Sequence, residues 1–361
     1  MSGERIPPKG RGAGYNPPNR FDPLHSEIEL ETVQDDAEYL EGLRRPETEF
    51  LDDRSRSIIA ENQSPDVGFE ASVNPYRGCE HGCIYCYARP THEYLGMSAG
   101  LDFETRIMVK RDAPALLRSA LSAPKWRSRV LSMSGVTDPY QPIERKLRIT
   151  RGCLEVMAEF RQAVTIVTKN RLVVRDVDLL ADLAAQGAAG VFLSITTLNP
   201  AMAADLEPRT SRPSGRLAAI RALSEAGVPT GVMVAPVIPG LTDHETPAIL
   251  EAAARAGARW AGYVAVRLPM AVAPLFTDWL ERHHPDARDK VLDRIRSMHG
   301  GKLYDPRFGD RMRGEGPIAD LIARLFKTSC RRLDLNVAPW PVSAQAFHRP
   351  SKTGDQLRLF D

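Results

Sequence analysis

The sequence predicts an α/β protein built from a repeated strand–helix unit. Apolar, strand-like runs recur along the middle of the chain, at residues 69–73, 130–133, 164–168, 191–196, 230–237 and 261–266. Amphipathic stretches rich in Ala, Leu and Arg lie between them, at residues 111–122, 175–186, 214–226 and 246–256. Glycines that commonly end helices follow three of these stretches, at Gly187, Gly227 and Gly257. This alternation favours a parallel sheet, and both a doubly wound sheet and a barrel fit it.

Composition divides the chain into four regions. Residues 1–66 are polar and rich in Pro, Gly, Arg and Glu, which predicts an extension that drapes over the domain. Residues 67–270 carry the strand–helix repeats. Residues 271–336 turn helical and basic, which predicts a helical cap with helices at 276–283, 286–299 and 317–328. Residues 337–361 form a tail rich in Pro and polar residues.

Charge and hydropathy exclude several classes of protein. The 361 residues carry 48 basic and 46 acidic side chains, a formal net charge of +2, which excludes a histone-like, polyanion-coating protein. No apolar run approaches the roughly 20 residues of a membrane helix, and the N-terminus lacks the apolar core of a signal peptide. The sequence therefore predicts a cytoplasmic protein with no membrane partner.

Three cysteines lie close together directly after the first predicted strand. They are Cys79, Cys83 and Cys86, in the order Cys-x-x-x-Cys-x-x-Cys. Thiolates at this spacing on a short loop can all face one soft metal centre. Zinc and an ordinary 4Fe–4S cluster each require four ligands. Three cysteines without a local fourth therefore suggest a cubane with one iron left open for a substrate or cofactor.

Two alternatives for the fourth ligand stay open. His81 would complete a Cys₃His zinc site, although it sits between the cysteines and cannot easily share their geometry. A distant thiolate from Cys153 or Cys330 would complete an ordinary four-thiolate site.

The cysteine spacing, with the aromatic Tyr85 just before the last cysteine and a strand–helix series around it, resembles the radical S-adenosylmethionine (radical SAM) superfamily. The resemblance implies a partial (βα)6, TIM-like barrel. It also implies a 4Fe–4S cluster on Cys79, Cys83 and Cys86 whose open iron binds the amine and carboxylate of S-adenosylmethionine. Such enzymes generate a 5′-deoxyadenosyl radical and take their electron from a flavodoxin- or ferredoxin-type donor.

Other strand ends resemble the spore photoproduct lyase-like (DNA repair photolyase-like) branch. The stretches that carry this resemblance are residues 84–87, 167–169, 193–196 and 226–236. The similarity covers roughly residues 74–268. Two stretches match an uncharacterised bacterial subgroup of that branch more closely, namely SPDVGFEASVNPYRGCEHGCIYCYARPTHEYLG and TDPYQPIE.

The same resemblance implies a binding site for S-adenosylmethionine. Lys169 and Ser194 would hold its carboxylate, since an ammonium and a hydroxyl at neighbouring strand ends form a charge-assisted clamp. The backbone around Tyr85 and the apolar side chain of Ile238 would receive the adenine.

Glu207 and Arg216 are a second charged pair near these positions in the sequence. They either support the cofactor site or form an ordinary ion pair on a helix surface, which contributes little to stability. The sequence leaves both interpretations open.

One departure from the lyase resemblance concerns the hydrogen donor. That resemblance requires a cysteine after the second strand, where this chain has none, and Cys153 lies well downstream in a predicted helix. The lyase reaction itself is therefore not carried over. Asp138 and Tyr140, with Gln141 and Glu144, form a polar cluster in which Tyr140 is a candidate hydrogen-atom or electron donor. The alternative is a capped turn at Asp138 before a helix.

The extreme C-terminus resembles the peptide by which bacterial polymerases and repair proteins dock on the sliding clamp. Gln356 would anchor in a polar pocket, while Leu357, Leu359 and Phe360 would supply apolar contacts. The alternative is a tail that folds back on its own domain. Basic residues of the N-terminal extension are candidates for phosphate contacts: Arg5, Lys9, Arg11 and Arg20.

The sequence as a whole predicts a radical SAM enzyme that acts on nucleic acid or a damaged base. Two other functions remain open. One is radical modification of a protein, a peptide or a small metabolite, and the other is a non-catalytic iron–sulfur redox or clamp-associated factor.

Overall fold

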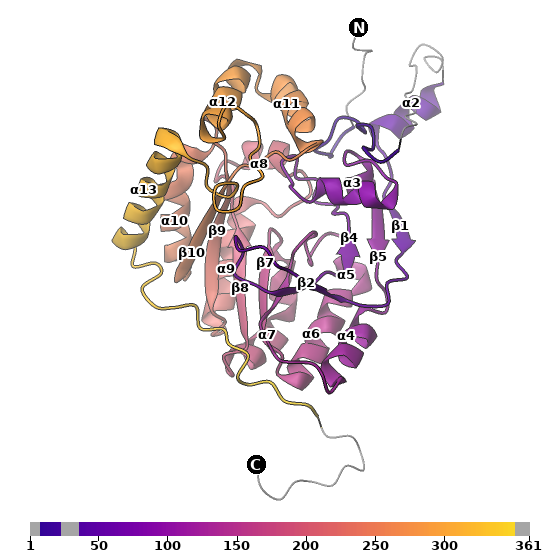
Figure 1. Cartoon of the computed structure of the whole chain (residues 1–361), viewed down its shortest axis with the longest axis vertical. Coiled ribbons are helices and arrows are strands. Elements are labelled where there is room, and N and C mark those ends of the chain that lie inside the picture. The colour runs from indigo at the N-terminus through magenta and orange to yellow at the C-terminus, as the bar shows by residue number, and fades with distance from the viewer. Residues whose placement is uncertain (1–7, 23–35, 351–361) are drawn as a thin grey trace, which may run out of the picture.

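A seven-stranded sheet forms the centre of the computed structural model, which describes residues 8–22 and 36–350 (Figure 1). Its strands are β2 (Ile59–Glu61), β3 (Ala71–Val73), β6 (Leu131–Met133), β7 (Val164–Thr168), β8 (Ala189–Ser194), β9 (Thr230–Val237) and β10 (Trp260–Ala265). Their order in the sheet is β10-β9-β8-β7-β6-β3-β2. The six strands from β3 to β10 in this sheet run parallel, and β2 adds antiparallel at the edge.

The parallel strands follow one another in the sheet as they do in the sequence. A doubly wound sheet reverses its order at a switch point, and this sheet has no such reversal. The winding is therefore that of a barrel, left open between β10 and β2. The predicted α/β partial barrel is confirmed.

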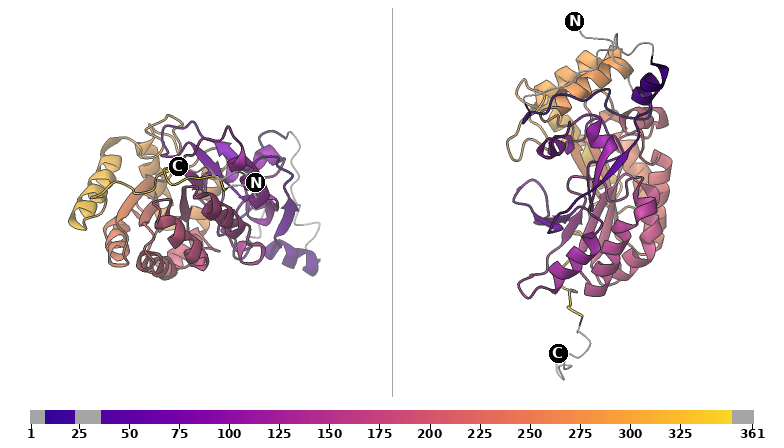
Figure 2. Two further views of the ribbon diagram at one scale, coloured as in Figure 1. Left: turned by 90° about the horizontal axis from the view of Figure 1, so that it is seen from below. Right: turned by 90° about the vertical axis from the view of Figure 1, so that its right-hand side faces the viewer.

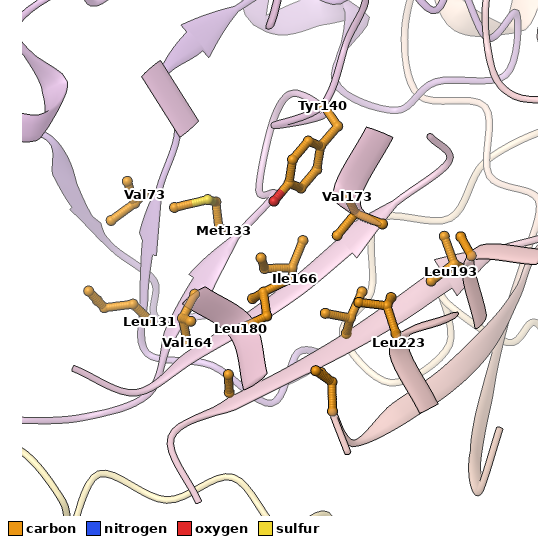
Figure 3. Packing of buried hydrophobic residues seen from close by; sticks show 14 of the residues in the cluster. Val73, Leu131, Met133, Tyr140, Val164, Ile166, Val173, Leu180, Leu193 and Leu223 are labelled. Carbon is orange, nitrogen blue, oxygen red and sulfur yellow. The ribbon is translucent and has the colours of Figure 1, made fainter. Parts of the chain in front are cut away.

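Helices cover one face of this sheet (Figure 2). They are α4 (Ala113–Ser122), α6 (Ile149–Phe160), α7 (Val177–Ala184), α9 (Pro213–Glu225) and α10 (Thr246–Arg255). Alternate residues of β7 point toward them, so Ile166 packs with Leu180 and Leu223 in one buried cluster (Figure 3). Removing this apolar surface from water is the main force that holds strands and helices together.

A second, three-stranded sheet of order β1-β5-β4 was not predicted from the sequence. Its strands are β1 (Glu49–Asp52), β5 (Arg106–Val109) and β4 (Tyr76–Arg77). The N-terminal segment is therefore not only a draped extension, because β1 pairs with β5 and β2 pairs with β3. Strands of two to four residues are too short to show a period of alternation, which is why the sequence did not reveal them.

The remaining short elements lie in the loops between these sheets and helices. They are α2 (Ala37–Arg44), α3 (Asp102–Thr105), α5 (Glu144–Leu147), α8 (Pro200–Leu206), and the 3₁₀ helices η1 (Arg89–Leu95), η2 (Arg171–Asp176) and η3 (Asp243–Glu245). None of the described helices is long and apolar enough to cross a membrane.

Three further helices stand after the last strand, close to the residues predicted for a cap. They are α11 (Val272–His283), α12 (Pro285–Met298) and α13 (Gly316–Arg332). The buried face of α11 and α12 belongs to the same apolar cluster as Cys83, Ile84 and Tyr85. In Figure 1 these two helices lie next to each other at the top of the view. Helices α11 and α12 therefore share a hydrophobic core with the cysteine loop, whereas the buried apolar residues of α13 belong to the main cluster.

Residues 337–350 run back along the sheet. The ring of Trp340 lies 4.5 Å from that of Phe192, and a Cβ on Gly190 would stand 2.2 Å from the Trp340 ring. Glycine at this position therefore makes room for the indole. The predicted clamp motif at residues 356–360 lies outside the described residues.

Candidate active site

The predicted functional residues gather at one edge of the sheet. The cysteine loop follows β3 and β4, Lys169 follows β7, Ser194 is the last residue of β8 and Ile238 follows β9. Carboxyl ends of parallel strands share one edge, and this edge is where enzymes of barrel architecture place their chemistry. The structure thus unites residues that lie up to 159 positions apart, from Cys79 to Ile238.

The three cysteines lie on one enclosed loop. Cys79 and Cys83 are each 8% exposed and Cys86 is half-buried. The loop is held by backbone bonds from Cys79 N to Phe103 O (2.9 Å) and from Ile84 N to Leu206 O (3.1 Å). Burial, then the Asp138 carboxylate and the neighbouring loop thiols, raise the pKa of Cys79 well above 9. Thiolates here therefore need a metal or another cation beside them.

Arg89 fills the inside of this loop. Its guanidinium donates to four backbone carbonyls around the cysteines, those of Cys83 (3.0 Å), Gly82 (3.1 Å), Gly100 (2.9 Å) and Ala99 (3.3 Å). It also pairs with Glu104, and both side chains are completely buried. This pair was not predicted from the sequence, because a single Arg and a single Glu fifteen residues apart have no recognisable spacing.

Glu104 extends the same network to the N-terminal segment. Its two carboxylate oxygens accept hydrogen bonds from the backbone N–H groups of Gly12 (3.0 Å) and Ala13 (2.8 Å). A Cβ on Gly12 would lie 1.9 Å from the carbonyl oxygen of Gly82, so only glycine permits this approach. The segment before the first strand is therefore part of the support of the cysteine loop.

His81 faces Asp138 instead of standing free. Its Nδ1 lies 3.3 Å from Asp138 Oδ2, and its Nε2 lies 3.2 Å from Asn170 Nδ2. Burial alone would raise the pKa of Asp138, but His81 and the donors of Lys169 and Thr168 outweigh it and lower that pKa. Both ring nitrogens of His81 are engaged, which argues against the Cys₃His zinc alternative.

The two remaining cysteines lie away from this loop. Cys153 is on α6 and Cys330 on α13, and both belong to the main hydrophobic cluster. Across residues 8–22 and 36–350, no three His, Cys, Asp or Glu side chains gather closely enough to hold a single metal ion.

Lys169 lies at the centre of a second cluster beside the cysteines. Its Nζ donates to Ser194 Oγ (2.7 Å) and Ala235 O (2.8 Å), and it forms an ion pair with Glu207 (3.2 Å). The ammonium also lies 5.6 Å from the centre of the Tyr85 ring. Since Tyr85 precedes Cys86, this contact joins the predicted carboxylate clamp to the cysteine loop.

Glu207 and Arg216 form a buried pair, so the interpretation as a surface ion pair is wrong. Burial alone would raise the pKa of Glu207, but Arg216 and Lys169 lower it well below its usual value. Two cations and one anion leave this cluster with one net positive charge. That excess matches one carboxylate of a ligand.

Ile238 and Tyr85 share an apolar surface on the other side of Lys169. Both are buried in the cluster that also holds Cys83, Ile84 and Leu206. The tyrosine hydroxyl donates to Glu207 and lies 3.2 Å from Thr196 Oγ1, so the ring is held in one orientation. Thr196 was not singled out from the sequence, although it stands two residues after Ser194, a spacing that places both on one face of an extended strand end.

The structure separates Tyr140 from these groups. Its ring is fully buried in the main hydrophobic cluster with Met133, Ile166 and Val173 (Figure 3). Burial and then Asp176 raise its pKa well above 10. Such an enclosed phenol is poorly placed to give a hydrogen atom to a substrate radical at the strand ends. Asp138, in contrast, stays beside the cysteine loop.

Gln141 and Glu144 also hold the framework. Gln141 accepts from the backbone N–H of Glu80 (3.0 Å), which lies within the cysteine loop. Glu144 pairs with Arg175 (2.8 Å) and accepts from Tyr76. The polar cluster predicted after the second strand is thus mostly a set of supports around Asp138.

A comparison with known families decides the family of the chain. The sequence model of the Radical SAM superfamily matches residues 73–253, which include the cysteine loop, Lys169, Ser194 and Glu207. The chain belongs to the radical SAM superfamily. It is therefore an enzyme of that superfamily, which implies a 4Fe–4S cluster and S-adenosylmethionine as its cofactors.

Relatives of this radical SAM enzyme occur in bacteria and archaea. The uncharacterized protein Rv2578c of Mycobacterium tuberculosis is 37% identical over 71% of the chain and 74% of its own length. The uncharacterized protein MJ0683 of Methanocaldococcus jannaschii is 30% identical over 51% of the chain and 66% of its own length.

Solved structures of spore photoproduct lyase share the fold of this radical SAM enzyme. A variant with bound AdoMet and dinucleoside spore photoproduct superposes with a TM-score of 0.56 at 18% identity, covering 79% of this chain and 78% of the other. The lyase complexed with dinucleoside spore photoproduct gives a TM-score of 0.55 at 18% identity, covering 79% of each chain. At this identity the likeness shows the fold alone.

The buried pair inside the cysteine loop supplies a stability test. Glu104→Gln leaves the Arg89 charge buried without its counter-charge, and we expect the free energy of unfolding to fall by about 3 kcal/mol. Glu159→Gln is the matched control, because Glu159 pairs with Arg118 in a solvent-exposed ion pair on the helical face. It should change the same quantity by no more than about 0.5 kcal/mol. Urea unfolding followed by circular dichroism measures both, and equal losses would contradict the assigned role.

Proposed function

We propose that Cys79, Cys83 and Cys86 hold a 4Fe–4S cluster with one open iron, that the Lys169 cluster binds S-adenosylmethionine beside it, and that the enzyme acts on nucleic acid or a damaged base. The observation that carries the proposal is the junction at Tyr85. Its ring lies against the Lys169 ammonium, its hydroxyl bonds to Glu207, and its neighbour in the chain is Cys86. One short segment thus brings a soft-metal donor set and an anion clamp together.

The donor set of the loop fits an iron–sulfur cluster. Cys83 and Cys86 lie close enough to Cys79 to raise its pKa, and soft thiolates are the ligands such clusters require. The two other cysteines lie in a different hydrophobic cluster from the loop, and both nitrogens of His81 are engaged. Within residues 8–22 and 36–350, neither His81 nor a fourth cysteine is therefore available to the loop, which supports an iron left open for the amine and carboxylate of S-adenosylmethionine.

The Lys169 cluster fits the carboxylate end of that cofactor. Ser194 and Thr196 place their hydroxyls beside the ammonium at 2.7 and 3.4 Å. Arg216 donates to Ser194 O (2.8 Å), so it fixes the strand end while it balances the charge of Glu207. The apolar surface of Ile238 and the backbone at Tyr85 would contact the adenine.

A cluster held by Cys79, Cys83 and Cys86 would supply the electron for reductive cleavage of S-adenosylmethionine and so the radical chemistry of the superfamily. The chain itself orients the cysteine loop and encloses the site. Arg89 and Glu104 keep the loop in one conformation. Helices α11 and α12 cover the same apolar cluster and keep water from it. We infer a flavodoxin- or ferredoxin-type protein as electron donor.

The proposed substrate class rests on the likeness of fold and of strand-end sequences to spore photoproduct lyase. The lyase reaction itself is not proposed, because β6 is followed by no cysteine before α6. A radical reaction on a protein, a peptide or a small metabolite is the competing assignment. Binding of an oligonucleotide by the reconstituted enzyme distinguishes the two, and absence of binding would favour the competing one.

Removal of one loop thiol tests the metal site. Cys83→Ala should abolish both the brown chromophore and the formation of 5′-deoxyadenosine from S-adenosylmethionine, because two thiolates rarely hold a cubane. Cys330→Ala removes a cysteine of α13 outside the loop and should keep both signals. Iron content, visible absorbance and the electron paramagnetic resonance spectrum of the reduced protein measure the outcome. A full cluster in Cys83→Ala would refute the ligand assignment, and its loss in Cys330→Ala would indicate a distant fourth ligand.

Removal of the ammonium tests the cofactor clamp. Lys169→Met should weaken binding of S-adenosylmethionine about tenfold or more, since a charge-assisted hydrogen bond to a carboxylate is lost. The cluster absorbance should stay unchanged. Lys146→Met removes an exposed lysine of α5 and serves as the control. Equilibrium dialysis with labelled cofactor measures both variants, and unchanged affinity in Lys169→Met would rule out the assigned role.

We further propose that residues 356–360 bind the bacterial sliding clamp through Gln356, Leu357, Leu359 and Phe360. Deleting residues 356–361 should abolish capture of the enzyme by immobilised clamp and leave its melting temperature unchanged. Leu333→Ala, at the end of α13, is a control that keeps the peptide. Retained capture after the deletion would disprove the docking proposal, and a lower melting temperature would instead favour a tail folded on its own domain.

A further inference from the structure

Arg267 stands beside the cysteine loop without a carboxylate partner. It follows β10 at the edge of the sheet that carries the site, and its guanidinium lies 4.2 Å from the centre of the Tyr87 ring. Its Nε is enclosed from solvent and has no hydrogen-bond acceptor. Among the described residues, no acidic side chain forms an ion pair with it. A cation in this state has lost part of its hydration and gained no counter-charge.

Tyr87 holds this guanidinium close to the reactive end of the site. It directly follows Cys86, and its side chain is 47% exposed. Its hydroxyl donates to Gly135 O (2.7 Å), and the backbone N–H of Gly135 in turn donates to Asn74 Oδ1 (2.9 Å). The ring is therefore fixed by the loops that follow β3 and β6. The guanidinium that stacks on it is held in the same place.

Nearby groups leave the positive charge uncompensated. Burial and the neighbouring Arg311 lower the pKa of Arg267, while Tyr87 raises it. The charge of Arg267 helps to lower the pKa of Asp66, but the two oxygens of that carboxylate already accept hydrogen bonds from Gly309 (2.6 Å) and Arg311. The two guanidiniums therefore share one carboxylate, and that carboxylate is engaged by Arg311.

A stacked guanidinium recognises an anion through its edge. Stacking on a ring uses the flat face, while the N–H donors in the plane remain directed outward. This edge matches two oxygens of a phosphate or carboxylate, and an incoming anion would also supply the acceptor that Nε lacks. Exposed aromatic rings next to cationic side chains are typical of surfaces that bind single-stranded nucleic acid. Tyr87 and Arg267 combine both features beside Cys86.

We propose that Arg267, stacked on Tyr87, binds a phosphate of the substrate next to the cysteine loop, and that this phosphate belongs to an unpaired stretch of a nucleic-acid strand. The proposal rests on the proposed function and adds to it a residue that positions the substrate. A free nucleotide offers the same phosphate chemistry, and the experiment separates the two sources.

The test compares Arg267→Gln, Arg267→Lys and the wild-type enzyme after cluster reconstitution. Fluorescence anisotropy with a labelled single-stranded oligodeoxynucleotide, at several salt concentrations, gives the affinity and its salt dependence. We expect Arg267→Gln to bind about tenfold more weakly and its salt slope to fall by about 0.7, the contribution of one phosphate contact on a single strand. Arg267→Lys keeps the charge but not the two-donor edge, so its affinity should lie between the other two.

Arg118→Gln is the matched control. It removes a guanidinium that lies 5.9 Å from the Phe160 ring on the helical face, away from the strand ends. Its affinity for the oligonucleotide should equal that of the wild type. A thermal shift with thymidine 5′-monophosphate and with inorganic phosphate gives a second readout for each variant.

Each outcome bears on the phosphate site. Equal affinity of Arg267→Gln and wild type would overturn it and leave the nucleic-acid substrate in place. Loss of the cluster absorbance in Arg267→Gln would overturn it as well, because the guanidinium would then serve Cys86. A third outcome is that the mononucleotide shifts the melting temperature of the wild type but not of Arg267→Gln, while the wild type does not bind the oligonucleotide. This outcome would support the site and assign the phosphate to a free nucleotide. No binding of either ligand by the wild type would overturn it. Failure of the radical chemistry itself would appear separately, as absent 5′-deoxyadenosine.

Discussion

The buried guanidinium of Arg89 is the interaction on which the site depends. The cysteine loop has no regular secondary structure, so its backbone carbonyls need donors from elsewhere. Arg89 supplies them to Gly82, Cys83 and Gly100, and Glu104 balances its charge. A buried pair of this kind adds little stability over apolar residues of the same size. Its value here lies in geometry, because it fixes the cysteines before any metal arrives.

The second cluster follows the same principle with a different charge balance. Glu207 draws together Arg216, Lys169 and the Tyr85 hydroxyl in the buried end of the sheet. One surplus positive charge remains, which a ligand carboxylate can neutralise. Arg267 also offers a positive charge to an anionic ligand, beside the cysteine loop, where one face of its guanidinium lies on the Tyr87 ring. The site thus brings cations from several elements close to the cysteine loop. Lys169 and Arg267 follow strands β7 and β10, whereas Arg89 lies on η1 and Arg216 on α9.

Several expectations were accurate because they depend on local chemistry. The periodicity placed β7 and β9 at their observed limits, and the helix after β9 within one residue of α10. The strand predicted just before the cysteine loop occurs as β3, the first strand of the parallel series. The hypothesis for Tyr140 shows the limit of reasoning from neighbouring residues alone. A tyrosine in a polar stretch suggested a donor at the site, whereas β6 and α6 direct its ring into the hydrophobic cluster. The sequence cannot show on which side of a turn a side chain lies.

By itself, the sequence determined the α/β class, the repeated strand–helix unit, the cysteine loop and the residues at the strand ends. These follow from periodicity and spacing, which are properties of neighbouring residues. Only the tertiary structure decided which distant groups meet. It distinguished the barrel-like winding from a doubly wound sheet, since strand order depends on how the units pack. It paired Arg89 with Glu104, recruited Gly12 and Ala13 to the same network, and left Arg267 Nε without a hydrogen-bond acceptor among the residues that the structure describes. Such contacts join separate segments, and no local pattern records them.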